Sequence, residues 1–531
     1  MRAPSPDDPA VLVVGAGPVG LVLACELTRH GVPIRVVDKL AQPTAESRAI
    51  LVHARSLEMM ERIGVVDELI ASGIKTTRTM AHSDGRAILD VPLDTVDSPF
   101  PFSVTTAQTE TERVLTERLA GLGVTVDRGV ELVSFEQDAD GVHATLRHGD
   151  GREERVTTAW IAGTDGSRSA VRQQAGTRLV GTFKGERFLL GDVEADHGLD
   201  ARAMHLFISA DHPPLIAFPM AGRRMRLIAE LDGTNGGDGG AAPTLERLQA
   251  VVDARADGIR LRTTHWTTVF EIRHAQVPRY RWGRAFLAGD AAHIHSPAGG
   301  QGMNTGMQDA FNLAWKLALV HAGRAGDALL DSYDAERHPI AAHVISTSTR
   351  ATRLATIEHS IARTLRNRAL RFAASLGPVQ RALADEAEET KIAYRGSPIV
   401  AGRSPGRGAP HPGDAAPDVP GTTLRATLLD GAPGETPHTV VSVAGRDQAG
   451  AAVPPPPLPR HDGVRHVLVT DRPSDDPAHD AVVVDPDRRV GIRYSFGAGG
   501  GMVVVRPDGY IGLIAELDDA DALAGYLATL R

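Results

Sequence analysis

Cysteine is almost absent from this sequence: among 531 residues there is one, Cys25. A single thiol can form no disulfide within the chain, no Cys-x-x-Cys redox pair and no thiolate cluster for zinc or for iron and sulfur. Residues 1–8 carry acids and prolines where a signal peptide would have its apolar core. We therefore expect a protein of the reducing cytoplasm that holds no metal.

Long apolar runs and an excess of positive charge are missing as well. The most apolar early stretch, residues 11–27, is interrupted by Gly15, Gly17, Pro18 and Gly20 and falls short of the roughly 20 residues that span a membrane. Lys and Arg number 57 against 66 Asp and Glu, a net charge of −9, and no basic block stands out. Nucleic acid demands a basic surface, so we expect neither a nucleic-acid partner nor a transmembrane helix.

The remaining composition is typical of a globular protein with several domains. Apolar residues make up 42% and charged residues 23% of the chain. The length is too great for one hydrophobic core, and a segment rich in proline and glycine at 403–421 marks a domain boundary. We divide the chain into residues 1–175, 176–280, 281–400 and 401–531, of which the first and third belong to one domain.

A dinucleotide-binding motif opens the first domain. Residues 11–14 form an aliphatic run typical of a buried parallel strand, and Gly-Ala-Gly-Pro-Val-Gly at 15–20 follows directly. A helix over 21–30 and a second strand over 34–38 complete a βαβ unit. The glycines permit the tight turn, the approach of a pyrophosphate and close packing of helix on strand, while Asp38 would accept from ribose hydroxyls. The motif does not distinguish NAD from FAD.

The rest of the chain predicts further sheets and helices. Residues 176–280 alternate apolar runs with Gly/Asp turns, as in an antiparallel insert domain. Apolar residues at a spacing of three and four predict a helix over 301–320, and more helices fill 325–395. Beyond the boundary we expect a small α/β domain with strands at 464–470, 481–484, 502–505 and 510–514 and a helix over 518–530.

Three later segments carry a resemblance to a known family. Gly-Thr-Asp-Gly-Ser-Arg at 163–168 resembles the Asp-Gly motif of the class A flavoprotein aromatic hydroxylases. Ala-Gly-Asp-Ala-Ala-His at 288–293 resembles their Gly-Asp motif, which Gly-Gly-Gln-Gly-Met-Asn at 299–304 continues. The resemblance covers residues 10–395, and Arg-Pro-Asp-Gly-Tyr at 506–510 is similar to the thioredoxin-like C-terminal domain of the phenol and polyketide hydroxylases. It implies an α/β fold: a Rossmann-type FAD-binding domain with an inserted β-sheet substrate domain, followed by a thioredoxin-like domain.

Each of these segments also has a plainer interpretation from its residues alone. A carboxylate at Asp290 can accept from the hydroxyls of a ribityl chain, or it can cap a turn. The glycine-rich stretch that leads into the helix at 301 can place backbone N–H groups under a flavin, or it is an ordinary loop before a helix. Asp165 can contact FAD or organise its own turn. Arg48 matches a family arginine on the FAD phosphates, although an arginine is more often a solvated surface charge.

Gln108 fits the family pattern Gln-x-x-x-Glu-x-x-Leu with Glu112 and Leu115, against the alternative of a polar helix face. His293 and His295 form a His-x-His, but no third ligand accompanies them, so we do not expect a metal. The resemblance then gives the complete set of expected FAD-binding residues: Gly15, Gly17, Pro18, Gly20, Asp38, Lys39, Arg48, Gln108, Asp165, Asp290, Pro297, Gly300, Gly302, Met303 and Asn304.

The resemblance implies an FAD-dependent monooxygenase that uses NAD(P)H, with NADPH slightly favoured, and O2. It would hydroxylate a small aromatic substrate, phenolic or polyketide, through a flavin C4a-hydroperoxide. Baeyer-Villiger oxidation, epoxidation, reduction and a non-catalytic flavin- or ligand-binding role stay open as alternatives. No residue can be chosen as the base that deprotonates the substrate. The tail has no cysteine for redox work, so it is structural or an interaction surface, and a homodimer is one state that it could serve.

Overall fold

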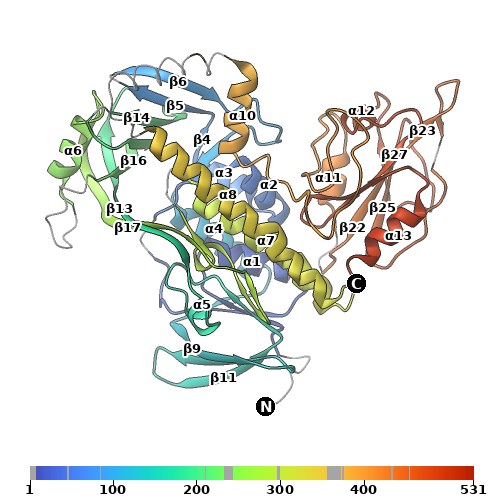
Figure 1. The fold of residues 1–531 in the computed structure, drawn as a ribbon, viewed down its shortest axis with the longest axis horizontal. Coiled ribbons are helices and arrows are strands. Elements are labelled where there is room, and N and C mark those ends of the chain that lie inside the picture. The colour runs from blue at the N-terminus through green and yellow to red at the C-terminus, as the bar shows by residue number, and fades with distance from the viewer. Residues whose placement is uncertain are drawn as a thin grey trace.

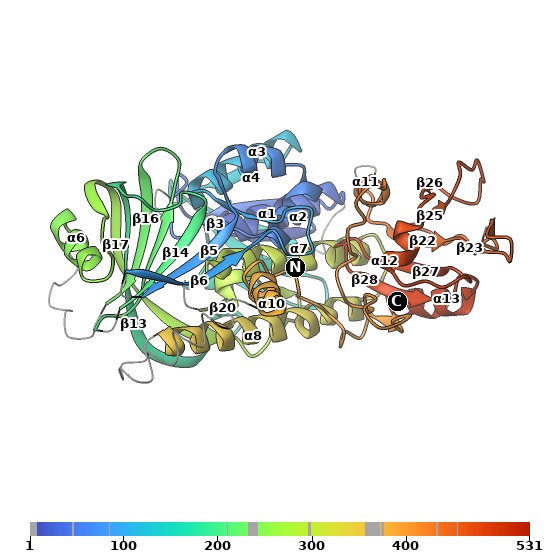
Figure 2. The same ribbon diagram turned by 90° about the horizontal axis from the view of Figure 1, so that it is seen from above.

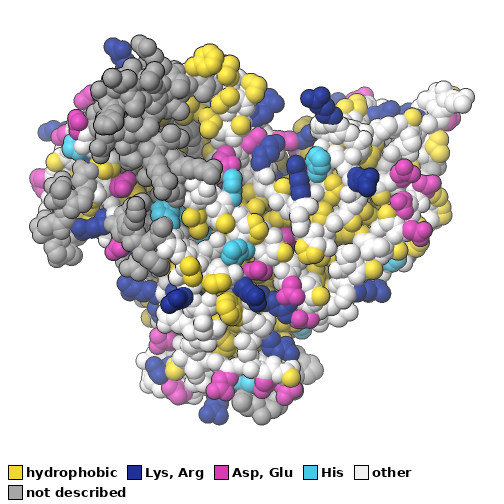
Figure 3. Space-filling model, viewed as in Figure 1, with side chains coloured by type: hydrophobic (Ala, Val, Ile, Leu, Met, Phe, Trp, Pro, Cys, Tyr) yellow, Lys and Arg dark blue, Asp and Glu magenta, His cyan; other side chains and the backbone are white. Residues whose placement is uncertain are grey.

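The computed structural model describes residues 8–44, 47–83, 85–209, 211–231, 243–295, 299–355, 372, 376–431, 434–453 and 455–531. Three parts lie in a row: an eight-stranded sheet, a domain built on a six-stranded sheet, and a tail formed by residues 401–531 (Figure 2). We call everything before the tail the body. On the face drawn in Figure 3, acidic and basic side chains are interspersed, and a notch separates tail from body.

The six-stranded sheet brings distant parts of the sequence side by side. Its strands run in the order β18 (Arg281–Trp282), β19 (Ala285–Leu287), β12 (Trp160–Gly163), β1 (Val11–Val14), β2 (Ile34–Asp38) and β8 (Val126–Arg128). All neighbours are parallel except β18 and β19. Every residue of β1 is buried, which explains its unbroken aliphatic run. Because parallel strands end at one edge, β1, β12 and β19 deliver their following loops to the same place.

Helices cover one side of this sheet, and α1 (Pro18–Arg29) packs between α4 (Gln108–Gly121) and α7 (Gln301–His321). On the β2 side the sheet meets a smaller antiparallel sheet of β9 (Val130–Gln137), β10 (Val142–His148) and β11 (Glu153–Thr158). The long helix α8 (Asp331–Ala355) runs obliquely from near the tail toward the eight-stranded sheet (Figure 1). In the part of the chain with described structure, no helix has both the length and the apolar character needed to cross a membrane.

The eight-stranded sheet extends beyond the expected insert, residues 176–280, in both directions along the chain. Its order is β20 (His293–Ile294), β17 (Arg260–Gln276), β13 (Val180–Asp196), β16 (Arg224–Glu230), β15 (Leu215–Pro219), β14 (Ala203–Ile208), β5 (Arg78–Ser83) and β6 (Arg86–Pro92). The pairs are antiparallel except β14 with β5. Strands β5 and β6 precede residue 176, so the expected boundary there is too simple. They join the sheet by pairing along the edge of β14, a contact that sequence spacing does not reveal.

Short elements connect these two sheets. Strands β3 (Leu51–Val52), β7 (Ser103–Thr105) and β4 (Ile74–Thr76) form a three-stranded sheet. Helix α2 (Ala54–Ile63) follows β3 and packs on α7. Among the described residues, the body also contains the α-helices α3 (Val66–Ala71), α5 (Ala170–Gln174), α6 (Leu245–Asp253) and α10 (Gly377–Ala387). Helix α6 covers one face of the eight-stranded sheet, and β3 therefore approaches the other.

The tail is built on its own six-stranded sheet. The order is β21 (Ala401–Gly402), β28 (Ile511–Ala515), β27 (Gly501–Val505), β22 (His438–Val443), β25 (Val464–Thr470) and β26 (Ala481–Val484). Strands β22, β25 and β26 are parallel, whereas β27 runs against both neighbours. Helices α11 (Leu424–Leu429), α12 (Arg489–Arg493) and α13 (Ala520–Ala528) accompany the sheet. After β22 the chain forms a hairpin of β23 (Gly445–Arg446) and β24 (Ala452–Val453).

Candidate active site

The three glycines of the motif at 15–20 have different surroundings. A Cβ on Gly15, whose φ is +103°, would lie 2.5 Å from the carbonyl oxygen of Thr164, and one on Gly20 would lie 1.9 Å from that of Gly15. These two positions are closed by the protein itself. A Cβ on Gly17 would meet nothing within 4 Å. The space in front of Gly17 is therefore left for a ligand, as the second glycine of a dinucleotide turn requires.

The start of α1 faces this open space. Gly17 is the N-cap of the helix, no side chain caps it, and Pro18 occupies the first turn. The first backbone N–H groups are left unpaired by the helix and carry partial positive charge, which suits a phosphate. Asp38, at the end of β2, accepts from the Ala16 N–H at 2.7 Å and from the Leu40 N–H at 2.8 Å, so it also supports the turn. Lys39 is exposed beside it.

The short segment that carries Arg48 is held from two sides. Gln108, the first residue of α4, accepts from the Ala49 N–H at 3.1 Å, and its own N–H donates to Ser47 Oγ at 2.9 Å. From β16, Arg226 donates to the Ala49 carbonyl at 2.8 Å and to Ser47 Oγ at 3.0 Å. Between these anchors the Arg48 side chain is exposed, close enough to Asp290 to lower the pKa of that carboxyl.

Sequence reasoning missed Arg226. Its side chain is 0% exposed and is neutralised by Asp192 on β13, with Nη2 to Oδ2 at 2.7 Å. A charge inside the apolar run of β16 was the available signal, since a buried arginine needs a carboxylate partner. Through Arg226 the eight-stranded sheet positions the Arg48 segment.

Asp165 organises the loop that follows β12. Its Oδ2 accepts from the backbone N–H groups of Ala170 at 2.6 Å and Val171 at 3.2 Å, at the start of α5. Oδ1 is buried without a hydrogen-bond partner among the described residues, and burial raises the pKa of the carboxyl. One oxygen therefore builds the turn, and the other is left for a donor on a ligand.

Asp290 lies in the short 3-10 turn Gly289–Ala291 after β19, with its side chain exposed. The surrounding protein raises the pKa of its carboxyl by restricting water, and His293, Arg48 and Arg172 oppose this effect. Asp290 is thus a carboxylate presented to the open edge of the sheet.

A buried trio fixes this turn from behind. Asp309 of α7 accepts from the Gly289 N–H at 3.1 Å and contacts His293 Nε2 at 2.7 Å through the same oxygen. Its other oxygen accepts from Arg337 Nε at 2.7 Å. All three side chains are 0–1% exposed. His293 is therefore occupied by a carboxylate, and no group of three metal-ligating side chains occurs among the described residues.

The glycine-rich loop ends at a second helix N-terminus. Gly300 is the N-cap of α7 with φ +69°, and no side chain caps the helix. Gly302 and Met303 are half-buried in the first turn. Asn304 is fully buried: its amide donates to the carbonyls of Leu51 and Gly300, both at 2.9 Å, and accepts from the His53 N–H at 3.0 Å. Its side chain ties the loop to β3, and Pro297 lies outside the described residues.

His53 is another residue that the sequence did not single out. It is 2% exposed, and its Nε2 lies 3.0 Å from the Gly299 carbonyl, which can only accept. Nδ1 lies 2.9 Å from Ser103 Oγ, which donates to Glu388 at 2.6 Å. Burial lowers the pKa of His53, but the charge of Glu388 outweighs it and the net shift is upward. The loop at 299–300 is therefore held by a buried chain of hydrogen bonds that runs from His53 through Ser103 to Glu388.

These features fit a flavin dinucleotide. Two uncapped helix N-termini, the open space at Gly17, the exposed Asp290 and the neighbouring Arg48 all belong to loops at one edge of the sheet. An apolar cluster on the eight-stranded sheet adjoins this edge through Leu51, which lies 3.2 Å from the Cβ position of Gly300. That cluster consists of Ile50, Leu51, Phe188, Leu190, Ile216, Phe218, Met220 and Ile228.

Comparisons with known proteins agree with this geometry. Residues 8–348 match the family described as an FAD binding domain, and residues 476–531 match the phenol hydroxylase C-terminal dimerisation domain. The molecule is therefore an FAD-binding oxidoreductase. More closely, the chain belongs to the class A FAD-dependent aromatic hydroxylases, which are monooxygenases.

Similarity to individual relatives extends over nearly the whole chain. It is 36% identical to 6-methylpretetramide 4-monooxygenase of Streptomyces rimosus, over 99% of this chain and 94% of the relative. It is 33% identical to pentachlorophenol 4-monooxygenase of Sphingobium chlorophenolicum, over 97% and 95%. Among solved structures, the OxyS anhydrotetracycline hydroxylase from Streptomyces rimosus has a TM-score of 0.74 at 28% identity and covers 98% of both chains.

Proposed function

We propose that the protein hydroxylates a polycyclic phenolic substrate of the polyketide type with NADPH and O2. One observation carries the proposal: the apolar and aromatic cluster on the eight-stranded sheet meets the glycine-rich loop at Leu51 and Gly300. A flat aromatic molecule is recognised by such a surface. The relatives named for tetracycline-type substrates support the same class.

The residues of the chain have separate tasks in this reaction. FAD supplies the redox chemistry, since it accepts hydride from NAD(P)H and activates O2. The α1 N-terminus at Gly17 holds the pyrophosphate, and Asp290 accepts from the ribityl hydroxyls. Backbone N–H groups at the start of α7 stabilise negative charge on the flavin ring. The apolar cluster excludes water and orients the substrate ring.

We propose further that the tail adopts a thioredoxin-like fold and forms a homodimer interface. The order β28, β27, β22, β25 with β27 antiparallel supports the fold, and the match to a dimerisation domain supports the interface. In a redox-active thioredoxin, the helix that carries the two cysteines follows the strand that corresponds to β22. Here the hairpin β23–β24 follows β22, and the tail contains no cysteine, so we propose no redox role for it.

The test is to incubate the FAD-loaded protein with NADPH and a panel of polycyclic phenols. Stimulated NADPH oxidation and a product heavier by one oxygen from labelled O2 support monooxygenation. The product structure then separates ring hydroxylation from Baeyer-Villiger insertion and epoxidation. Substrate that returns reduced and unlabelled identifies a reductase. Tight ligand binding without faster NADPH oxidation identifies a non-catalytic protein, and either result would refute the proposal.

A further inference from the structure

A cleft lies between the body and the tail, away from the loops that form the flavin site. Its empty volume is about 500 Å³ with the open mouth included. Helices α2 and α7 form one wall, and the turn at 508–510 and helix α11 form the other. The α7 residues that line it, Gln308, Phe311 and Asn312, lie two to three turns beyond the helix start at Gln301. A ligand in this cleft would touch body and tail together.

Three arginines line the cleft, and two of them have a carboxylate partner. Arg55 pairs with Glu58, and Arg425 pairs with Glu61. Arg62 makes no hydrogen bond and no ion pair with any residue that the structure describes. It reaches toward the tail, where its Nη2 lies 2.8 Å from the position that a Cβ on Gly509 would take.

The acids of the cleft cannot serve Arg62. Asp508 accepts from Arg506 Nε at 3.0 Å and from Trp315 Nε1 at 3.0 Å, and Glu58 accepts from Ser98 Oγ at 2.7 Å in addition to Arg55. Each carboxylate already has a cation or several donors. Arg62 therefore has no carboxylate at ion-pair distance among the described residues, and Glu26 and Asp508 act on its charge only from farther away.

Other donors in the cleft are unsatisfied. Arg55 is 8% exposed and lies over the Tyr510 ring at 5.6 Å, yet its Nε–H is buried without an acceptor among the described residues. The Nε–H of Arg425 is also buried without an acceptor in this part of the structure. Unpaired buried donors are costly, and both of these arginines line the same cleft as Arg62.

The electrostatics of the cleft also favour an anion. Burial, together with the positive charges of Arg29 and Arg425, outweighs the opposing charges of Glu26 and Asp508 and lowers the pKa of Arg62 to about 10. Arg62 is thus still charged at neutral pH, among like charges and in restricted water. A negative ligand would relieve this repulsion.

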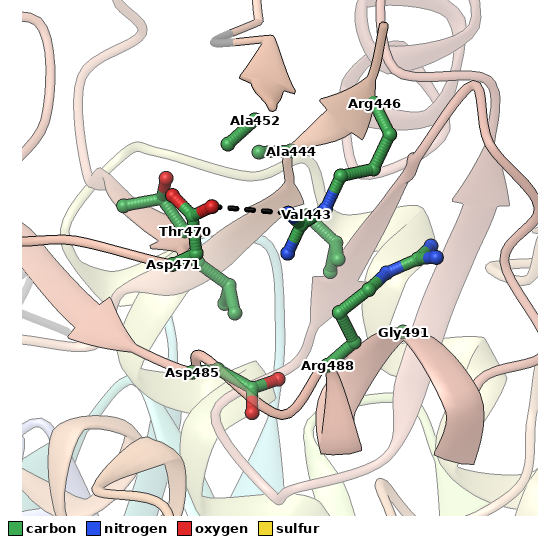
Figure 4. Close-up of a pocket in the computed structure, with 10 residues that line it drawn as sticks. Val443, Ala444, Arg446, Ala452, Thr470, Asp471, Asp485, Arg488 and Gly491 are labelled. Carbon is green, nitrogen blue, oxygen red and sulfur yellow. Dashed lines mark hydrogen bonds and ion pairs between the residues drawn. The ribbon is translucent and has the colours of Figure 1, made fainter. Parts of the chain in front are cut away.

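A second cavity, in the tail, provides a contrast (Figure 4). There Arg446 pairs with Asp471 at 3.0 Å. Asp485 accepts from the N–H groups of Arg489 at 2.9 Å and Val490 at 2.8 Å. The carboxylates of that cavity already have partners within the protein. We therefore do not propose a ligand there.

We propose that the cleft between α2 and the tail binds a small oxyanion of phosphate type, held by the guanidinium of Arg62 beside the positive charges of Arg55 and Arg425. A guanidinium presents paired N–H donors that match two oxygens of such a group. The ligand joins tail to body and does not take part in the flavin reaction. Free phosphate and the phosphate group of a nucleotide share this chemistry.

The experiment titrates the full-length, FAD-loaded protein with sodium phosphate at constant ionic strength, followed by calorimetry and by the melting temperature. We expect saturable binding of one phosphate per chain and a higher melting temperature than in chloride. Arg62→Ala should weaken the affinity at least about tenfold, because charge-assisted hydrogen bonds are lost, while FAD content stays at the wild-type level. The matched control is Arg152→Ala, which removes an exposed arginine outside the cleft and should leave the affinity unchanged.

Two further arms complete the test. Arg62→Gln, which removes the charge but keeps part of the side chain and an amide donor, replaces the alanine variant if that variant does not fold. Displacement of phosphate by NADPH and not by NADH would assign the site to a nucleotide 2′-phosphate, and no displacement by either would assign it to the free oxyanion. Lack of saturable phosphate binding by the wild-type protein, or equal affinity in Arg62→Ala, overturns the proposal. Neither result bears on the monooxygenase reaction, which is measured separately.

Discussion

Arg506 of the tail donates two parallel hydrogen bonds to Glu336 of α8, Nη1 to Oε1 at 2.6 Å and Nη2 to Oε2 at 3.0 Å. Both side chains are 0% exposed. Lys316 donates to the same carboxylate at 2.7 Å, and Asp508 balances the second positive charge. Arg506 and Asp508 of the tail therefore form one buried cluster with Glu336 and Lys316 of the body, in which two positive and two negative charges balance. This cluster holds the tail against the body.

We predict that Arg506→Ala lowers the free energy of unfolding by about 3–5 kcal/mol. Removing one member of a buried ion pair leaves the other charge uncompensated, which accounts for this size. Urea denaturation measures the change. Arg460→Ala is the control, since its pair with Asp480 is about half exposed and should be worth at most about 1 kcal/mol. Equal effects of the two substitutions would show that the buried pair has no special weight.

The acid stability of the protein should depend on Glu336. Burial by itself would raise the pKa of Glu336, but Arg506 and Lys316 outweigh it and lower the pKa well below the usual 4.5. A carboxyl with a lowered pKa contributes stability that is complete above its unfolded pKa and is lost as the pH falls below it. We expect the melting temperature to decline below about pH 4.5. The decline should be shallower in Glu336→Gln and unchanged in the exposed control Glu131→Gln, and identical slopes in all three would contradict the assignment.

Gly17→Val should abolish FAD binding and leave the fold intact. A Cβ at this position meets no protein atom within 4 Å, so the valine side chain starts in the space expected for the pyrophosphate. Gly20→Val should instead impair folding, because its Cβ would lie 1.9 Å from the Gly15 carbonyl. Flavin released per folded chain, with circular dichroism as the check on folding, measures both. Gly121→Val, also at an open position, should retain FAD, and a Gly17→Val protein with full FAD would refute the interpretation.

Asp290→Ala should weaken FAD binding by about 1–3 kcal/mol, or roughly tenfold to a hundredfold in Kd. The substitution removes the exposed acceptor on the turn but leaves the Asp309 bond to Gly289, so the turn should survive. Fluorescence quenching of FAD on titration of the apoprotein gives the constant. Asp475→Ala, at an exposed position of the tail, serves as the control. An unchanged Kd in folded Asp290→Ala would make Asp290 a residue of the turn alone.

A chain truncated after residue 398 should keep its flavin motifs but lose stability. Removal of the tail uncovers Trp315 and leaves Glu336 and Lys316 without Arg506 and Asp508. We expect aggregation or a lower melting temperature, and in any soluble fraction hydroxylation that is still coupled to NADPH oxidation per bound FAD. A soluble, FAD-loaded truncation that does not hydroxylate would give the tail a part in the reaction.

The FAD-binding class could be predicted from the sequence because the motifs that indicate it are local patterns. The expected helix over 301–320 is α7, Gln301–His321, since its apolar spacing directly reports a buried face. The partners of the residues that support the flavin loops could not be predicted. Arg226, Asp309 and Arg337 act through partners distant in the sequence, and their pairing depends on how the sheets close. The tail's central strand β22 was not predicted, although all of its residues are buried, because it mixes polar residues with valines.

The arrangement of the six-stranded sheet also determines when the flavin site can form during synthesis. Val11 of β1 pairs with Ile34 on one side, which is translated soon afterwards, but with Trp160 on the other. Strand β12 in turn pairs with β19, and Gly289 bonds to Asp309, so both need partners that are synthesised later. Contacts between such distant residues slow folding, and a ribosome adds only about 5–20 residues per second. The nascent N-terminal unit therefore emerges many seconds before it can be completed, and FAD has no finished site to enter until nearly two thirds of the chain has left the ribosome.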